Sequence, residues 1–127
     1  LVQERKLENT IIFKGKTNEV YTELNKAKIF LMTSEQECFP MVILEANACG
    51  VPVLSFDCPT GPRNIIHHQE DGVLVPHNDE EEMLQMLEFL AQNSTKIQRL
   101  SEGAVQNAKN YELQKVMNLW KSLIFDH

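Results

Sequence analysis

Two short apolar runs separated by a helix-forming stretch restrict what this chain can fold into. Ile29 to Met32 is one run, and Val51 to Ser55 is the other. Their length and polar flanks favour buried strands over helices. Between them, Met41 to Ala48 has a helix-forming composition, and Gly50 is the residue type expected just past a helix end. The pattern predicts a β-α-β unit with two neighbouring parallel strands.

The turn between the first strand and the helix has the character of an anion-binding site. Pro40 is predicted at the first helical position, where its missing N–H costs nothing and its fixed φ suits the helix. The free N–H groups of Met41 and Val42, with the positive end of the helix dipole, would point out of the carboxyl edge of the sheet. Open α/β sheets bind their ligands at this edge.

Two carboxylates flank this predicted anion site. Glu37 lies in the turn, and Glu45 lies about one turn into the helix. Carboxylates beside a phosphate repel it, so we interpret them as partners of neutral hydroxyl groups on either side of a diphosphate. A sugar nucleotide carries hydroxyls, a diphosphate and hydroxyls in that order. A Glu pair also occurs on helices merely as a favourable or solvated charge, and here the strand-turn-helix-strand context favours the ligand site.

Residues 34–53, Ser-Glu-Gln-Glu-Cys-Phe-Pro-Met-Val-Ile-Leu-Glu-Ala-Asn-Ala-Cys-Gly-Val-Pro-Val, resemble a known signature. They are similar to the E-x7-E motif of retaining glycosyltransferases of the GT4 family (glycosyl transferases group 1), and the resemblance runs from about Asn9 to Asn93. It implies one Rossmann-like, three-layer α/β/α domain over residues 1–127, with a small parallel sheet. Such a domain is the donor-binding, carboxy-terminal half of a GT-B fold.

The resemblance also implies a role for each site residue. Glu37 would hydrogen-bond a hydroxyl of the transferred sugar and serve as the catalytic carboxylate, and Glu45 would bind the ribose hydroxyls. Sugar and diphosphate would contact the backbone of the turn, whose residues are Cys38, Phe39, Pro40, Met41 and Val42. The family pattern often has glycine at the positions of Cys38 and Pro40, so this turn offers one amide fewer and Met41 becomes the better anion contact. Gly15, Lys16 and Thr17 would lie near the base, although Lys16 is equally compatible with a solvated loop.

A second segment, Asp-Cys-Pro-Thr-Gly-Pro-Arg-Asn at residues 57–64, forms a stiff turn after the second strand. It resembles a GT4 branch that transfers hexoses or N-acetylhexosamines from UDP-sugars, with GDP remaining open. That branch is expected to carry an acidic residue where Asn64 stands, so Thr60 and Arg63 are only weak site candidates.

The remaining elements follow from periodicity and capping signals. We expect strands at Ile11 to Phe13 and Val73 to Pro76, the latter as a fourth strand, and a short helix beginning at Ile65 and Ile66. The expected helices are the tail of one at Leu1 to Leu7, then Asn18 to Lys26, one capped by Asn78 or Asp79 through Ala91, one capped by Ser94, and a last one with Val116 to Ile124. In the two-domain family the final helices cross to the amino-terminal domain, so Trp120, Ile124 or Phe125 should be partly exposed here.

Composition narrows the class of protein. A length of 127 residues fits one domain with its own core, and the chain begins at Leu1, so we read it as a soluble piece of a longer protein. A net charge of −6 and a pI near 5.2 argue against a nucleic-acid partner. Three cysteines without a C-x-x-C pair fit the reducing cytoplasm, with Cys49 as core packing and Cys38 and Cys58 in turns. No apolar run approaches the roughly twenty residues that span a bilayer.

No cofactor and no metal are expected. His67, His68, His77 and His127 do not have the spacing of a ligand set, and we expect the first two to be a solvated loop pair.

The expected partners are a nucleotide-sugar donor and, through a missing amino-terminal domain, a glycan or lipid-linked acceptor. Peripheral membrane association of the full-length protein is compatible with this reading, and no turnover is expected from this chain alone. The alternatives are a non-catalytic nucleotide-binding or interaction module of the same fold and half of a sugar-nucleotide epimerase.

Overall fold

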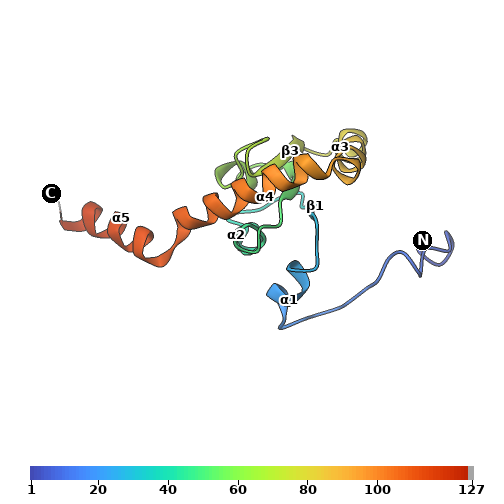
Figure 1. Cartoon of the computed structure of the whole chain (residues 1–127), viewed down its shortest axis with the longest axis horizontal. Coiled ribbons are helices and arrows are strands. Elements are labelled where there is room, and N and C mark those ends of the chain that lie inside the picture. Colours follow the sequence, from blue (N-terminus) through green and yellow to red (C-terminus); the bar gives the residue numbers. More distant parts are fainter. Residues whose placement is uncertain (126–127) are drawn as a thin grey trace.

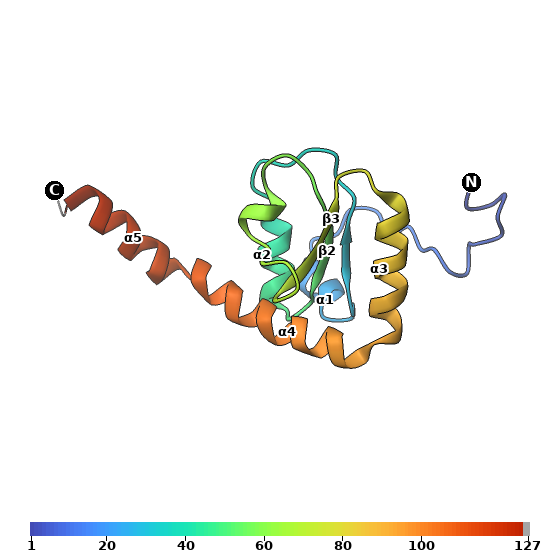
Figure 2. The same ribbon diagram turned by 90° about the horizontal axis from the view of Figure 1, so that it is seen from above.

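The computed structural model describes residues 1–125 and shows a small parallel sheet covered by helices (Figures 1 and 2). The strands are β1 (Phe30–Met32), β2 (Val53–Asp57) and β3 (Gly72–Pro76). The α-helices are α1 (Val20–Leu24), α2 (Met41–Ala48), α3 (Glu80–Gln92), α4 (Ser94–Ala108) and α5 (Leu113–Phe125), and two 3-10 turns, η1 (Pro62–Asn64) and η2 (Lys109–Tyr111), complete the chain.

The sheet has the order β1-β2-β3, and both strand pairs are parallel. Phe30 pairs with Val53, and Val53 in turn pairs with Gly72. Because the strands are parallel, each connection must return across the sheet, and α2 makes that return between β1 and β2. All three carboxyl ends therefore meet at one edge.

Side chains of the central strand β2 alternate between two apolar layers, as strand geometry requires. Val53 faces a cluster formed with α1 and α2, whose buried members include Leu24, Met32, Ile43, Ala46 and Ile65. Leu54 and Phe56 face a second cluster with Val73, Val75, Met83, Leu90 and Leu100. Figure 2 shows the corresponding helices, α2 on one side of the sheet and α3 on the other. This is the three-layer α/β/α arrangement that the sequence predicts.

The carboxy-terminal helices lead away from this body. α4 runs along the end of the sheet opposite the 33–40 loop, and α5 projects beyond it (Figure 2). On α5, Trp120 is 58% exposed, Ile124 58% and Phe125 76%. The prediction that these residues are exposed in this chain is confirmed.

The predictions for the amino-terminal segment are wrong. Leu1 to Leu7 forms turns instead of the tail of a helix, and Ile11 to Phe13 is an exposed extended stretch outside the sheet. Figure 1 shows this segment running away from the domain. A strand needs a neighbouring backbone for its hydrogen bonds, and β1 pairs with β2 instead. The predicted fourth strand is consequently the third strand of a three-stranded sheet, and the helix expected over 18–26 is limited to α1.

Several boundaries also differ from the predictions. β2 begins two residues late because the Val51 N–H bonds to the Ala46 carbonyl and helps to close α2. Asp79 caps α3 by accepting from the Glu82 N–H at 2.9 Å, as expected. The next cap is Asn93, which accepts from Lys96, instead of the predicted Ser94. The short helix expected from Ile65 onward is instead η1, which precedes it.

Candidate functional site

Several of the predicted site residues lie in two loops that meet at the carboxyl ends of β1 and β2. One loop, residues 33–40, joins β1 to α2, and the other, residues 58–61, joins β2 to η1. Figure 2 shows both loops at the same edge of the sheet, above the strands. The β-α-β geometry thus brings together two segments that lie about twenty residues apart in the sequence.

Contacts between the loops centre on Glu37. The Thr60 hydroxyl donates a hydrogen bond to the Glu37 carbonyl oxygen. Gly61 is buried with φ of 72°, and a Cβ there would lie 2.8 Å from the Glu37 Cβ and 3.1 Å from the Pro40 Cδ. Only a residue without a Cβ fits, because the left-handed conformation and the close approach both disfavour a side chain.

The start of α2 differs from the prediction by one residue. Pro40 is the N-cap, with φ of −74° and ψ of 93°, because its extended ψ keeps it outside the helix. The Ile43 N–H bonds to the Pro40 carbonyl, so the N–H groups of Met41 and Val42 precede the first intrahelical bond. No acidic residue lies in this first turn, so the positive end of the dipole is not neutralised there. Met41 is 58% exposed.

The two glutamates of the motif occupy the expected elements. Glu37 is half-buried in the loop, and Glu45 is half-buried on α2. Within residues 1–125, neither carboxylate takes part in an ion pair. Both are therefore free to accept hydrogen bonds from a ligand. Cys38 and Phe39, the two residues after Glu37, are exposed.

The weak site candidate Arg63 forms an ion pair with Asp57, which the sequence did not predict. Its Nε and Nη2 donate to the Asp57 carboxylate at 2.8 and 2.9 Å, in a fork that closes the end of β2 onto η1. Asp57 carries no local signal, since pairing across six residues depends on the turn between them. Arg63 is thus charge-balanced, and Thr60 and Gly61 are members of this segment that approach Glu37.

Two further residues support the loops. Phe39 packs against Tyr111, with ring centroids 6.3 Å apart, and burial raises the pKa of the Tyr111 phenol. Cys58 is fully buried, and this burial raises the pKa of its thiol, with a smaller effect in the same direction from the Glu37 carboxylate. Cys58 is therefore core packing. Tyr111 has no local sequence signal, while Gly61 before a proline is a turn signal that indicates such a position.

Gly15, Lys16 and Thr17 do not adjoin a strand of the sheet. All three are exposed, and Thr17 caps the following turn by accepting from the Glu19 N–H at 2.9 Å. The predicted strand that would precede them does not form, and their place near the base of a donor stays a prediction.

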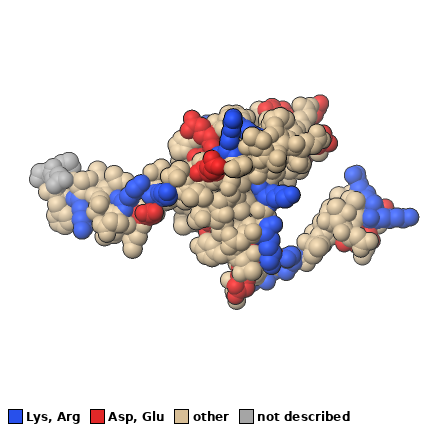
Figure 3. Space-filling model, viewed as in Figure 1, with Lys and Arg blue, Asp and Glu red and all other residues tan. Residues whose placement is uncertain are grey.

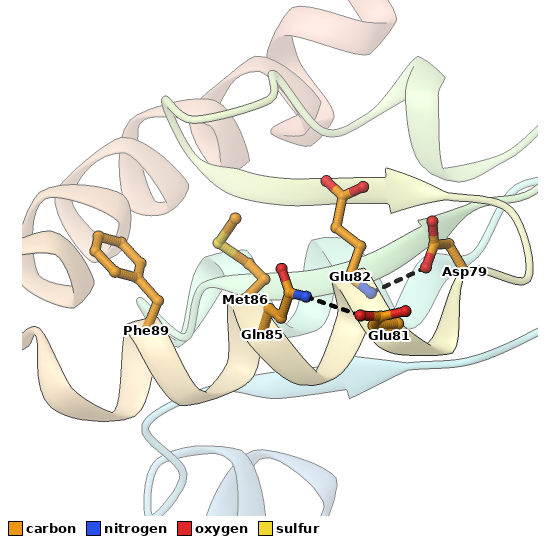
Figure 4. Close-up of a pocket in the computed structure, with 6 residues that line it drawn as sticks. All are labelled: Asp79, Glu81, Glu82, Gln85, Met86 and Phe89. Carbon is orange, nitrogen blue, oxygen red and sulfur yellow. Dashed lines mark hydrogen bonds between the residues drawn. The ribbon is translucent and has the colours of Figure 1, made fainter.

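A hollow on the outer side of α3 has the wrong charge for an anionic ligand. Figure 4 shows its lining residues, Asp79, Glu81, Glu82, Gln85, Met86 and Phe89. Asp79 caps the helix, and Gln85 donates to Glu81 at 3.4 Å. The carboxylates would repel a phosphate. On the face shown in Figure 3, acidic and basic side chains are interspersed.

The histidines have structural partners. His67 and His68 are exposed, as expected, but His67 Nδ1 lies 2.7 Å from the buried Asp71 carboxylate, and His68 Nδ1 accepts from the Leu74 N–H. His127 lies outside the described residues.

Within residues 1–125, no three His, Cys, Asp or Glu side chains cluster as a metal site would require. None of the helices described there is long and apolar enough to cross a bilayer.

The chain is similar in sequence to known glycosyltransferases. The family model described as "Glycosyl transferases group 1" matches residues 1–110. An uncharacterized glycosyltransferase of Haemophilus influenzae is 29% identical over 118 residues, which are 93% of this chain and 33% of that protein. A Campylobacter jejuni relative is 28% identical over 91% of this chain and 32% of its own length; it is named N-acetylgalactosamine-N,N'-diacetylbacillosaminyl-diphospho-undecaprenol 4-alpha-N-acetylgalactosaminyltransferase.

A solved structure shares the fold. The crystal structure of Anabaena Alr3699/HepE in complex with UDP superposes with a TM-score of 0.86 at 21% identity, over 96% of this chain and 34% of that one. The chain spans about one third of the length of each of these three proteins.

Proposed function

The chain belongs to the glycosyl transferases group 1 family, and from that premise we propose that it is the donor-binding domain of a retaining GT4 glycosyltransferase. The full-length protein would transfer a hexose or an N-acetylhexosamine from a UDP-sugar to a glycan or lipid-linked acceptor in polysaccharide or lipopolysaccharide synthesis. An amino-terminal domain would hold the acceptor, so this chain would bind the donor without turnover.

One observation carries the proposal: the Glu37 loop leads into the amino end of α2 at the carboxyl edge of a parallel sheet, and Glu45 follows on the second turn of that helix. Open α/β sheets bind ligands at this edge, and the unpaired amides of Met41 and Val42 suit a diphosphate. An ionised carboxylate can only accept hydrogen bonds, so the partners of the two half-buried glutamates would be donors such as sugar hydroxyls.

The proposed roles follow this arrangement. Glu37 accepts from a hydroxyl of the transferred sugar, and Glu45 accepts from the ribose hydroxyls. The backbone from Cys38 to Val42 contacts sugar and diphosphate, with the Met41 amide as the main anion contact. Gly15, Lys16 and Thr17 remain candidates for the base only if the amino-terminal segment takes a different path in the full-length protein.

In the proposed reaction, these residues position the donor and stabilise the negative charge that develops on the departing diphosphate. The bond between the anomeric carbon and the diphosphate oxygen breaks, and the acceptor oxygen bonds to the anomeric carbon on the same face. The electron pair of the broken bond leaves with the nucleoside diphosphate, whose freed oxygen takes the proton that the acceptor hydroxyl loses. Amides aimed at that leaving group stabilise it in a site that holds them in place beforehand.

Two comparisons support the choice of donor and acceptor. A structural neighbour was crystallised with UDP, and the Campylobacter relative is named for transfer of an N-acetylhexosamine to a diphospho-undecaprenol acceptor. A lipid-linked acceptor would bring the full-length protein to the cytoplasmic face of a membrane as a peripheral protein. The donor is a substrate, and the proposal includes no cofactor and no metal.

A titration followed by backbone amide NMR tests the proposal. UDP, GDP and ADP are added to the chain, and UDP is expected to shift amides from Glu37 to Glu45 most. Glu45→Ala should weaken UDP binding roughly tenfold or more, because a hydrogen bond to a charged group is lost. The exposed Glu88 on α3 supplies the matched control, Glu88→Ala, which should leave binding unchanged. Absence of UDP-dependent shifts in the full-length protein as well would refute the proposal.

A further inference from the structure

We propose that the segment from Asp57 to Gly61, here called the threonine loop, positions Glu37 for the sugar of the donor, with Thr60 and Gly61 as the positioning residues. This inference rests on the proposed function. It assigns a specific task to residues that bind no ligand themselves.

The Glu37 loop has little structure of its own. Residues 33–40 form neither helix nor strand, and Glu35, Gln36, Cys38 and Phe39 are all exposed. A loop of this kind samples several conformations unless other parts of the fold hold it. The direction of the Glu37 side chain therefore depends on whatever contacts its backbone.

The threonine loop supplies two such contacts from the side of β2. Thr60 donates its hydroxyl hydrogen to the Glu37 carbonyl, which fixes the peptide plane that follows Glu37. Gly61 approaches so closely that a Cβ would lie 2.8 Å from the Glu37 Cβ. The carboxylate is joined to that carbon through Cγ, so the backbone of Gly61 limits the directions that the Glu37 side chain can take.

The threonine loop is itself rigid enough for this task. The Cys58 side chain within the threonine loop is fully buried. The side chain of Pro62, the residue that follows the loop, is fully buried as well. The fork between Asp57 and Arg63 joins the two ends of the turn. The Asn64 N–H closes η1 by bonding to the Gly61 carbonyl at 3.0 Å. A constrained segment thus braces a loop that has no helix or strand of its own and that carries a binding carboxylate.

The test distinguishes recognition of the transferred sugar from recognition of the nucleotide. UDP has no transferred sugar, so a change that misplaces Glu37 should weaken binding of a UDP-sugar while binding of UDP is retained. The probes are UDP and whichever of UDP-glucose and UDP-N-acetylglucosamine the unmodified protein binds. Thr60→Val removes the hydroxyl and keeps the shape, and it should weaken UDP-sugar binding roughly two- to tenfold. Thr60→Ser keeps the hydroxyl and should restore it.

Gly61→Ala should have the same selective effect and should also shift the Glu37 amide resonance of the ligand-free protein. Gly50→Ala is the matched control, since Gly50 has a similar φ of 67° but a Cβ there would meet Ser101 and Val105 on α4 instead of Glu37. Both variants strain the backbone, and only Gly61→Ala should change the ratio of the two affinities. An unchanged ratio in Thr60→Val and Gly61→Ala overturns the inference, as does equal weakening of both probes. If the unmodified full-length protein binds no UDP, the proposed function itself fails.

Discussion

Replacing Gly103 by alanine should destabilise the fold, although alanine is the better helix former. Gly103 lies within α4, where α4 crosses the turn before β3. A Cβ there would lie 2.1 Å from the Glu70 carbonyl oxygen, 2.9 Å from its carbon and 3.2 Å from the Asp71 Cα. These are backbone atoms, so no side-chain rotation relieves the overlap. The helix and the turn would have to separate by roughly 1 Å to restore ordinary contact.

The turn cannot move easily. The Asp71 carboxylate accepts from the His67 N–H at 2.8 Å, Gln69 bonds to the Gly72 carbonyl at 2.8 Å, and Lys96 donates to the Gln69 carbonyl at 3.1 Å. Overpacking against a constrained neighbour costs about 3 kcal/mol. The gain in helix propensity from glycine to alanine offsets about 1 kcal/mol of this. The expected net loss is about 2 kcal/mol of the free energy of unfolding.

Urea unfolding followed by circular dichroism measures this loss. The exposed neighbour Glu102 provides the control, because the difference between Glu102→Ala and Glu102→Gly reports the propensity effect in the same helix. That pair should favour alanine by about 1 kcal/mol, while the Gly103 pair should favour glycine. A Gly103→Ala protein as stable as the parent, or more stable, would refute the reasoning from close approach.

Two further predictions concern Cys58 and Trp120. Because burial raises the pKa of Cys58, the folded thiol stays protonated while the unfolded thiol ionises near about pH 8.5, so stability should fall as pH rises from there toward the folded pKa. Urea unfolding at several pH values should show a smaller decline for Cys58→Ala, and iodoacetamide should modify the exposed Cys38 well before Cys58; equal labelling of the two thiols in the folded protein would contradict the assignment. Trp120 is the single tryptophan and is 58% exposed, so its fluorescence in this chain should be red-shifted and quenched by acrylamide. If α5 packs on an amino-terminal domain, the full-length protein should show blue-shifted, protected emission, and identical spectra would argue against that packing.

Local patterns alone predicted the central unit of the fold. The apolar run before Thr33, the helix from Met41 to Ala48 and the glycine that ends it are specified by composition, length and capping preferences, which act within a few residues. The presence of Glu37 in a turn and Glu45 on the helix follows from the same signals. The alternation of strands and helices was sufficient to predict a parallel sheet with its ligand edge at the carboxyl ends.

Only the tertiary structure decided which segments join the sheet and what supports Glu37. Ile11 to Phe13 has the composition of a strand but lies outside the sheet, because a strand exists only where a partner backbone accepts its hydrogen bonds. The contacts of Thr60 and Gly61 with Glu37, and the pairing of Asp57 with Arg63, join residues whose separation in space depends on how β2 and its turn pack. Gly103, which on propensity alone only weakens a helix, is required by the approach of a turn some thirty residues away. Hydrogen-bond and packing preferences along the chain select the elements, whereas distances of a few ångströms between elements are set by the packed fold.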